Sequence, residues 1–232
     1  MDQQKKRKRH SRGVNELPEP EASADYVQDA APRLVKVAAI TAISFALYDG
    51  ANRVLLDRQE SREDARQIVV GYREGTISIT AVRLMVLLDA DPNVVSFQTV
   101  YRRLNRAEVV DELVRRARDR SPWAEALEDQ VEANIRASVR KFLETYKTIN
   151  WHDLHGRLQH FRNHGLAHLL PQRIKKRVSY AEIASLVRSV TVLGECLVSF
   201  DPGGVPLRVD EIKDWSDRAK SVWEAAFREL RT

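Results

Sequence analysis

The sequence predicts an all-α fold, and three observations support that prediction. Apolar residues recur every three or four positions in nearly every segment after residue 32, which is the period of an amphipathic helix. The 232 residues include only 9 Gly and 8 Pro, too few for a fold with many strands and turns. The single cysteine, Cys196, rules out a disulfide framework and a zinc site built on cysteines. A chain of this length can bury a core in one large domain or in two small ones.

The first half of the chain is expected to form four or five helices. Residues 33–48 are apolar almost all round, as a buried helix is, and residues 61–74 are charged but compatible with a helix. Residues 76–90 begin with alternating β-branched side chains, yet the long apolar run that follows favours a helix over a strand. Ser96 is expected to cap the helix that follows Asp91-Pro92, and residues 107–118 repeat the helical pattern.

The second half is expected to form four further helices. Pro122 opens the longest one, residues 122–148, whose apolar residues step by three and four along one face. Asn150 is a suitable N-cap and Pro171 ends a helix, which places the next helix at 151–169. Ser179 and Glu182 have the spacing of a capping box, which opens a helix to about residue 199. Residues 208–230 carry their apolar side chains on one side.

The net charge of +5 comes entirely from the N-terminal tail. The first 13 residues hold six basic residues and one acidic residue, and the 32 basic and 32 acidic residues of the remainder balance. We expect a disordered basic tail at 1–24, because it has too few apolar residues to fold. A helical domain is expected at 25–200. The amphipathic helix within 201–232 is expected to pack on this domain or on a dimer partner.

The composition points to a cytoplasmic protein. No apolar run approaches the ~20 residues that span a membrane, and the first residues are too charged for a signal peptide. The chain also lacks a phosphate-binding glycine loop, a His-Glu-x-x-His pair and a Gly-x-Ser-x-Gly elbow, which argues against the enzyme classes that use them.

Five of the six histidines lie between His152 and His168, in the helix expected at 151–169. An apolar stripe ~80° wide runs along this helix, and Arg162 and His168 lie about 60° from Gly165 on opposite sides of it. Gly165 would allow the backbone of another helix to approach closely. We therefore expect this helix to pack on a copy of itself and to bring two Arg/His sets together. The stripe consists of Leu154, Leu158, Phe161, Gly165 and Leu169.

Arg162-Asn163, four further residues and His168 resemble the signature of the HEPN superfamily, an Arg followed after four to six residues by His in a late helix. The order of the helices between about 30 and 200 is similar to that of the abortive-infection (AbiU-type) branch. Arg83-Leu84 leads through an Asp-rich turn to a short helix, and a long helix, the Arg–His helix and a basic loop come before the helix that Ser179 caps.

The resemblance implies a metal-independent endoribonuclease that acts as a homodimer without a cofactor, in phage defence or beside an antitoxin. His168 would be the general base or acid, Arg162 would stabilise the transition state, and Asn163 would orient the histidine or the phosphate. This chemistry is reasonable, because attack by a ribose 2′-OH needs a base near neutral pH and a cation for the developing charge. Relatives paired with a nucleotidyltransferase antitoxin carry a Tyr two residues after the His, where this chain has Leu170. Silencing through that Tyr is therefore not expected.

Other interpretations of the cluster remain open. His160, His164 and His168 have a spacing that can bind Zn²⁺ through two imidazoles, but no carboxylate or Cys lies near them, so we expect no metal and treat His160 and His164 as auxiliary residues. The histidines can also belong to a solvated polar face. Arg157 and His164 form a second Arg–His pair that lacks the Asn.

A basic run directly follows the cluster and is expected to contact RNA phosphates, although it can also be a simple loop. It consists of Arg173, Lys175, Lys176 and Arg177. The alternative to a ribonuclease is a non-catalytic helical module that binds RNA or another protein. Such a module has no need of the imidazole of His168.

Overall fold

The computed structural model describes residues 18–57, 63–120, 124–149, 151–161, 178–200 and 208–229. The prediction of an all-α fold is confirmed for these residues, which form eight α-helices, a short 3-10 helix at Val198–Phe200 and no strand. The helices are α1 (Pro20–Asp57), α2 (Glu63–Leu87), α3 (Phe97–Leu104), α4 (Ala107–Arg120), α5 (Ala124–Thr148), α6 (Trp151–Phe161), α7 (Tyr180–Leu197) and α8 (Val209–Glu229).

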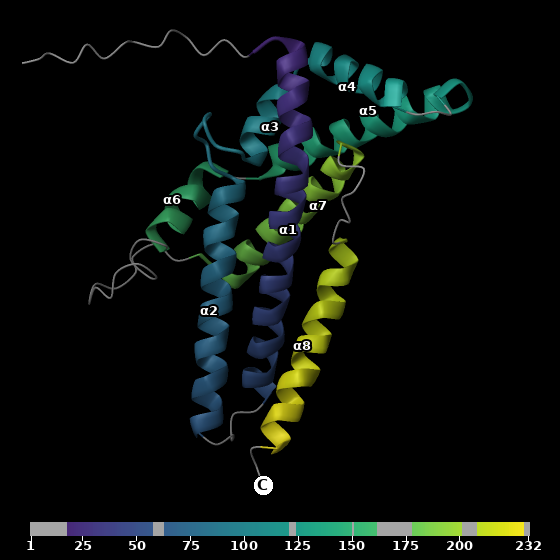
Figure 1. Cartoon of the computed structure of the whole chain (residues 1–232). Helices are drawn as coiled ribbons and strands as arrows, with labels where there is room; N and C mark the ends of the chain where they lie inside the picture. The colour runs from purple at the N-terminus through teal and green to yellow at the C-terminus, as the bar shows by residue number, and fades with distance from the viewer. Residues whose placement is uncertain are drawn as a thin grey trace, which may run out of the picture.

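Helix α1 is the central element of the fold. It runs between α2 and α8 in Figure 1, and it also packs against α3, α4 and α7. Its buried positions are mostly small residues, which let neighbouring helices approach its backbone. This packing agrees with the prediction that residues 33–48 form a buried helix.

The bounds of α1 differ from the prediction at both ends. The helix begins at Pro20, so residues 20–24, which we expected in the tail, are helical, with Ser23 and Ala24 fully buried. It also passes through Pro32, where the sequence indicated a helix start. A proline inside a helix removes one backbone hydrogen bond, and here the packing of α1 against several helices offsets that loss.

Helix α2 joins two segments that the sequence separated at Gly75. It is continuous from residue 63 to 87, which confirms a helix over a strand for its β-branched part. The hydroxyls of Thr76 and Thr80 are buried and donate to backbone carbonyls one turn earlier, at Tyr72 and Thr76. These bonds satisfy the threonine hydroxyls within the helix, which explains why the β-branched residues do not break it.

The predicted helix caps at Ser96 and Ser179 are confirmed, and the one predicted at Asn150 lies outside the described residues. The Ser96 side chain accepts from the backbone N–H of Thr99, whose hydroxyl accepts from the N–H of Ser96. Ser179 and Glu182 form the same reciprocal pair at the start of α7. Each cap satisfies backbone donors that would otherwise lack a partner.

One main apolar core connects seven of the helices. Phe97 of α3 and Phe142 of α5, both fully buried, meet edge to face with ring centroids 6.0 Å apart. A smaller apolar cluster lies where α1, α2 and α8 run together, and it contains Ala51, Val54, Val69 and Phe227. The C-terminal helix is thus held by apolar contacts to the domain.

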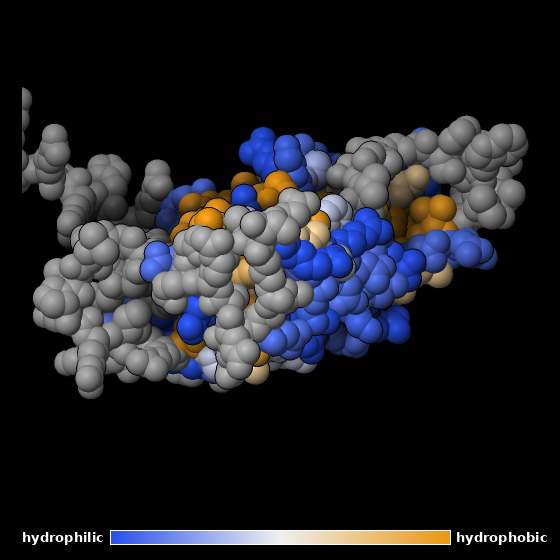
Figure 2. Space-filling view, turned by 90° about the horizontal axis from the view of Figure 1, so that it is seen from below, coloured by the Kyte–Doolittle hydropathy of each residue, from blue (hydrophilic) through white to orange (hydrophobic). Residues whose placement is uncertain are grey.

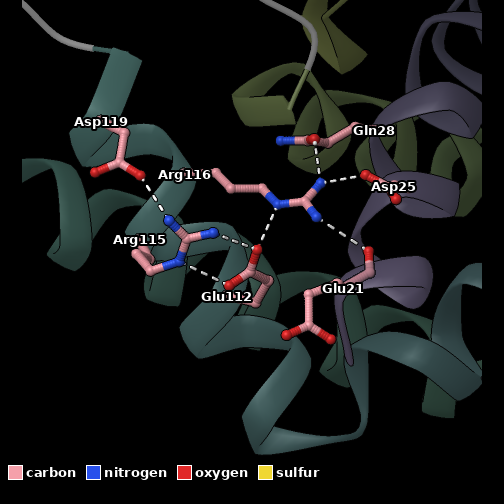
Figure 3. Close-up of polar contacts among 7 residues, drawn as sticks. All are labelled: Glu21, Asp25, Gln28, Glu112, Arg115, Arg116 and Asp119. Carbon is pink, nitrogen blue, oxygen red and sulfur yellow. Dashed lines mark hydrogen bonds and ion pairs between the residues drawn. The ribbon is translucent and has the colours of Figure 1, made fainter. Parts of the chain in front are cut away.

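Helix α4 is joined to the N-terminal part of α1 by polar contacts (Figure 3). The guanidinium of Arg116 donates to the carboxylates of Glu112 (2.6 Å) and Asp25 (2.5 Å), to the side chain of Gln28 (3.1 Å) and to the backbone carbonyl of Glu21 (3.1 Å). Three of these four partners lie on α1. Arg116 therefore adds a polar link to the apolar packing between the two helices.

Helix α8 approaches α1 most closely at Gly50. A Cβ placed on Gly50 would lie 2.6 Å from the Cβ of Ala219, and 2.8 Å from both the backbone nitrogen of Lys220 and the carbonyl oxygen of Ser216. Real side chains do not tolerate such distances, so the crossing of α1 and α8 requires glycine at this position.

Two helices are long and apolar enough to cross a membrane by length and composition, Pro20–Asp57 and the stretch Tyr180–Phe200. This finding limits the expectation that no apolar run approaches membrane-spanning length. Within the apolar windows of these helices, 56% and 61% of the residues are buried in the fold. Seen from below, the surface carries hydrophobic residues in several separate places among hydrophilic ones (Figure 2).

Candidate functional site

The helix predicted at 151–169 is present as α6 over residues 151–161. His160 lies in its last turn and is partly buried. The other predicted site residues lie outside the described residues. They are the proposed catalytic residues Arg162, Asn163 and His168, the auxiliary His164, and the basic residues Arg173, Lys175, Lys176 and Arg177.

The first part of the predicted stripe faces the core of its own chain. Leu154 is 9% exposed and Leu158 fully buried, and both belong to the main apolar core. These two leucines are therefore not available to a second copy of the chain. The predicted packing of this helix on a second copy could therefore use only the part of the stripe that contains Gly165 and Leu169. That part lies outside the described residues.

An ion pair joins α6 to the start of α7. Arg157 donates to Glu182 at 2.6 Å, and both side chains are partly buried. Glu182 also accepts from the backbone N–H and the hydroxyl of Ser179, at 2.7 and 2.8 Å. The bonds from Arg157 and then Ser179 lower the pKa of Glu182 to about 2, so the carboxylate stays charged at neutral pH.

This ion pair joins the described residues that come before and after the predicted site in the sequence. The site follows Phe161, four residues after Arg157, and the basic run ends at residue 177, five residues before Glu182. The two flanks of the predicted site are thus held side by side. Arg157 is engaged in this contact, which weakens the interpretation of Arg157 and His164 as the Arg–His pair of the site.

The part of the chain that the structure describes contains no group of three or more His, Cys, Asp or Glu residues that could hold a metal ion. Cys196 is buried in the core, and this burial raises the pKa of its thiol to about 11. The thiol is therefore protonated and unreactive at neutral pH.

A pocket lies between α1, α7 and α8, with a volume of about 290 Å³. Its wall is mainly apolar, with contributions from all three helices, such as Phe45 of α1, Val187 of α7 and Ile212 of α8. Arg188 of α7 and Lys213 of α8 also line it. An apolar wall with a few polar groups is typical of small-molecule sites.

Asp49 organises the polar side of this pocket. One of its carboxylate oxygens accepts from the phenol of Tyr180 (2.6 Å), and the other accepts from the hydroxyl of Ser216. Burial and this hydrogen bond to Asp49 raise the pKa of Tyr180 above its usual value, so the phenol remains a donor at neutral pH. Nearby, Arg53 of α1 pairs with Asp217 of α8 at 2.6 Å.

Sequence reasoning did not find this pocket. Its polar residues are distant from one another in the chain, namely Asp49, Tyr180 and Ser216. None of them belongs to a local sequence motif that predicts a binding site. The one available signal was Tyr180, which directly follows the Ser179 cap and comes three residues after the basic run.

Comparisons of the chain with protein-family models, curated proteins and solved structures found no match. The resemblance to the HEPN superfamily therefore rests on the residues of this sequence alone.

Proposed function

We propose that the chain is a cytoplasmic, metal-independent endoribonuclease of the HEPN type, which acts as a homodimer and serves as a toxin in phage defence or beside an antitoxin. The observation that carries this proposal is the motif Arg162-Asn163, four residues, His168, in a chain whose predicted order of helices resembles that of the abortive-infection branch.

Each motif residue has a defined role in the proposed reaction. His168 removes the proton of a ribose 2′-OH, or protonates the leaving 5′-oxygen, because an imidazole titrates near neutral pH. The guanidinium of Arg162 neutralises the charge that develops on the phosphate. Asn163 orients His168 or the phosphate. One Arg/His set supplies too few groups for both acid and base, which is why the proposal includes a dimer.

One structural feature and one sequence feature support the proposal. The ion pair between Arg157 and Glu182 joins the two helices that flank the segment with the motif, so the described residues on either side of that segment lie close together. The same segment contains the basic run, in a chain whose other charges balance outside the N-terminal tail. Four cations close to the motif suit a polyanionic substrate.

The test compares the wild-type chain with Arg162→Ala and His168→Ala for cleavage of RNA in excess EDTA. We expect the wild type to cleave and both variants to lose about 100-fold or more in rate, which is typical for removal of an acid–base group or of a group that stabilises transition-state charge. His152→Ala is the matched control, an imidazole on the same predicted helix that was not placed in the site, and should retain most activity. Cleavage by His168→Ala at the wild-type rate would refute the proposal.

The same proteins distinguish the alternative function. A non-catalytic RNA-binding module would bind RNA without cutting it, and His168→Ala would leave its affinity unchanged. A protein-interaction module would neither bind nor cut RNA.

The basic run has its own test. Replacing Arg173, Lys175, Lys176 and Arg177 by Gln should weaken RNA binding and reduce the slope of log K against log[salt] by about 0.7 for each lost phosphate contact. The control replaces four exposed cations on helix surfaces, Arg33, Lys36, Arg140 and Lys147. An equal reduction in both variants would show that the basic run has no specific role.

The dimer is tested by light scattering of the wild type. We expect twice the chain mass at micromolar concentration. A monomer at that concentration and above would contradict a composite site.

A further inference from the structure

The charge around the pocket between α1, α7 and α8 favours an anionic ligand. Arg188 and Lys213 line it from two helices, both side chains are exposed, and within the described part of the chain neither one has an ion pair. The one acidic lining residue, Asp49, already accepts two hydrogen bonds from Tyr180 and Ser216. Two cations thus face the pocket beside one carboxylate that is already engaged.

The wall of the pocket favours a flat apolar body. The rings of Tyr180 and Phe45 stack with centroids 5.6 Å apart and planes at 29°. Tyr180 is 45% exposed, so a large part of its surface remains open to a ligand. Aliphatic side chains of α7 and α8 complete the apolar wall. Aromatic rings of a ligand pack well on such a surface, offset from the protein rings.

The size of the pocket limits the ligand. A volume of about 290 Å³ is close to the lower end for small-molecule sites, roughly 300 Å³. One or two fused rings with a single charged group fill such a space. A long chain or a larger cofactor does not fit.

We propose that this pocket binds a small aromatic carboxylate, with its rings against Tyr180 and its carboxylate between Arg188 and Lys213. The guanidinium of Arg188 offers the planar pair of donors that matches a carboxylate, and the ammonium of Lys213 adds a second positive charge. Binding here does not depend on RNA cleavage, since the pocket contains none of the proposed catalytic residues.

The test titrates the full chain with 1-naphthoate and follows binding by calorimetry. Two further probes separate the parts of the site, namely 1-naphthamide, which has the rings without the charge, and acetate, which has the charge without the rings. We expect 1-naphthoate to bind at least about tenfold more tightly than either. The amide lacks hydrogen bonds to a charged group, which are worth roughly that factor or more, and acetate lacks the apolar rings that the pocket would bury. Equal affinity for the acid and the amide would overturn the proposal.

Variants locate the binding. Arg188→Gln and Lys213→Met should each weaken 1-naphthoate binding about tenfold, and both replace exposed side chains, so the fold should be retained. Arg218→Gln removes an exposed cation from α8 that does not line the pocket, and should leave the affinity unchanged. Ala184→Leu should weaken binding by filling the pocket, with circular dichroism as the check on folding. Wild-type affinity in both Arg188→Gln and Lys213→Met would overturn the assignment.

Discussion

The two ends of α1 differ in how closely they approach the neighbouring helices. Near its N-terminus, α1 meets α4 through the guanidinium of Arg116 and a set of oxygen acceptors (Figure 3). Toward its C-terminus, α1 meets α8 at Gly50, where the backbones approach so closely that no side chain fits.

The difference lies in how much each contact tolerates change. The contact of α1 with α4 is partly exposed, and water can replace much of what a lost arginine provided. The contact at Gly50 has no such substitute, because an added atom must move a whole helix. We therefore expect stability to depend more on the close backbone approach at Gly50 than on the polar contacts of Arg116.

The largest expected effect is that of Gly50→Ala. The new methyl group would lie within 2.8 Å of backbone atoms of α8, so α8 must shift. We expect a loss of about 3 kcal/mol in the free energy of unfolding, at the upper end for overpacking. Urea denaturation followed by circular dichroism measures this loss.

Gly75→Ala is the matched control for that substitution. Gly75 lies on α2 with no atom within 4 Å of an added Cβ. The exchange should stabilise the protein by about 0.5–1 kcal/mol, which is the difference in helix propensity between Ala and Gly. An equal change in the free energy of unfolding for Gly50→Ala and Gly75→Ala would contradict the close approach of α1 and α8 at Gly50.

A smaller effect is expected for Arg116→Gln. This change removes the hydrogen bonds that link α4 to α1. The side chain is 17% exposed, so its contacts are worth more than those of a surface pair, and we expect a loss of about 1 kcal/mol. A loss in the free energy of unfolding equal to that of Gly50→Ala would contradict the expected difference in tolerance between the two ends of α1.

The pH dependence of the same contact gives a further test. Hydrogen bonds from Arg115 and then Arg116 lower the pKa of Glu112 from 4.5 to about 2. Because the folded pKa lies below the unfolded one, the stabilising contribution is complete above about pH 5 and is lost as the pH falls from 4.5 toward 2. The difference in stability between wild type and Glu112→Gln should therefore shrink over this range. A difference that is independent of pH would contradict the role of the charge.

The smallest effect is expected for Arg115→Gln. Arg115 bonds to Glu112 and Asp119, but its side chain is 60% exposed and does not reach α1. We expect less than about 0.5 kcal/mol. A loss larger than that of Arg116→Gln would contradict the greater contribution that burial and the link to α1 give to Arg116.

The features that were predictable from the sequence are local ones. The cap at Ser179 was predicted from the capping-box spacing of Ser179 and Glu182, and the cap at Ser96 from a serine directly before a helical pattern. The bounds of α1 and α2 were wrong at Pro32 and Gly75, where tertiary packing overrides the local preference of proline and glycine to end a helix.

The two sites show the same limit. The Arg162–His168 motif could be recognised in the sequence because its residues lie within one short segment. Its catalytic role stays a prediction. The pocket at Asp49 could not be predicted from the sequence, because its wall comes from three helices that are far apart in the chain and meet only in the fold. No pattern in the sequence connects Asp49 with Tyr180 or Ser216.

The most direct test of the proposed function is the chemical nature of the RNA ends after cleavage in excess EDTA. Attack by the 2′-OH should leave a 2′,3′-cyclic phosphate or the 3′-phosphate derived from it, and DNA, which lacks that hydroxyl, should remain intact. Mass spectrometry of a short chimeric substrate with a single ribonucleotide identifies both products. Activity that EDTA abolishes, or cleavage that leaves a 3′-hydroxyl, would contradict catalysis by Arg162 and His168.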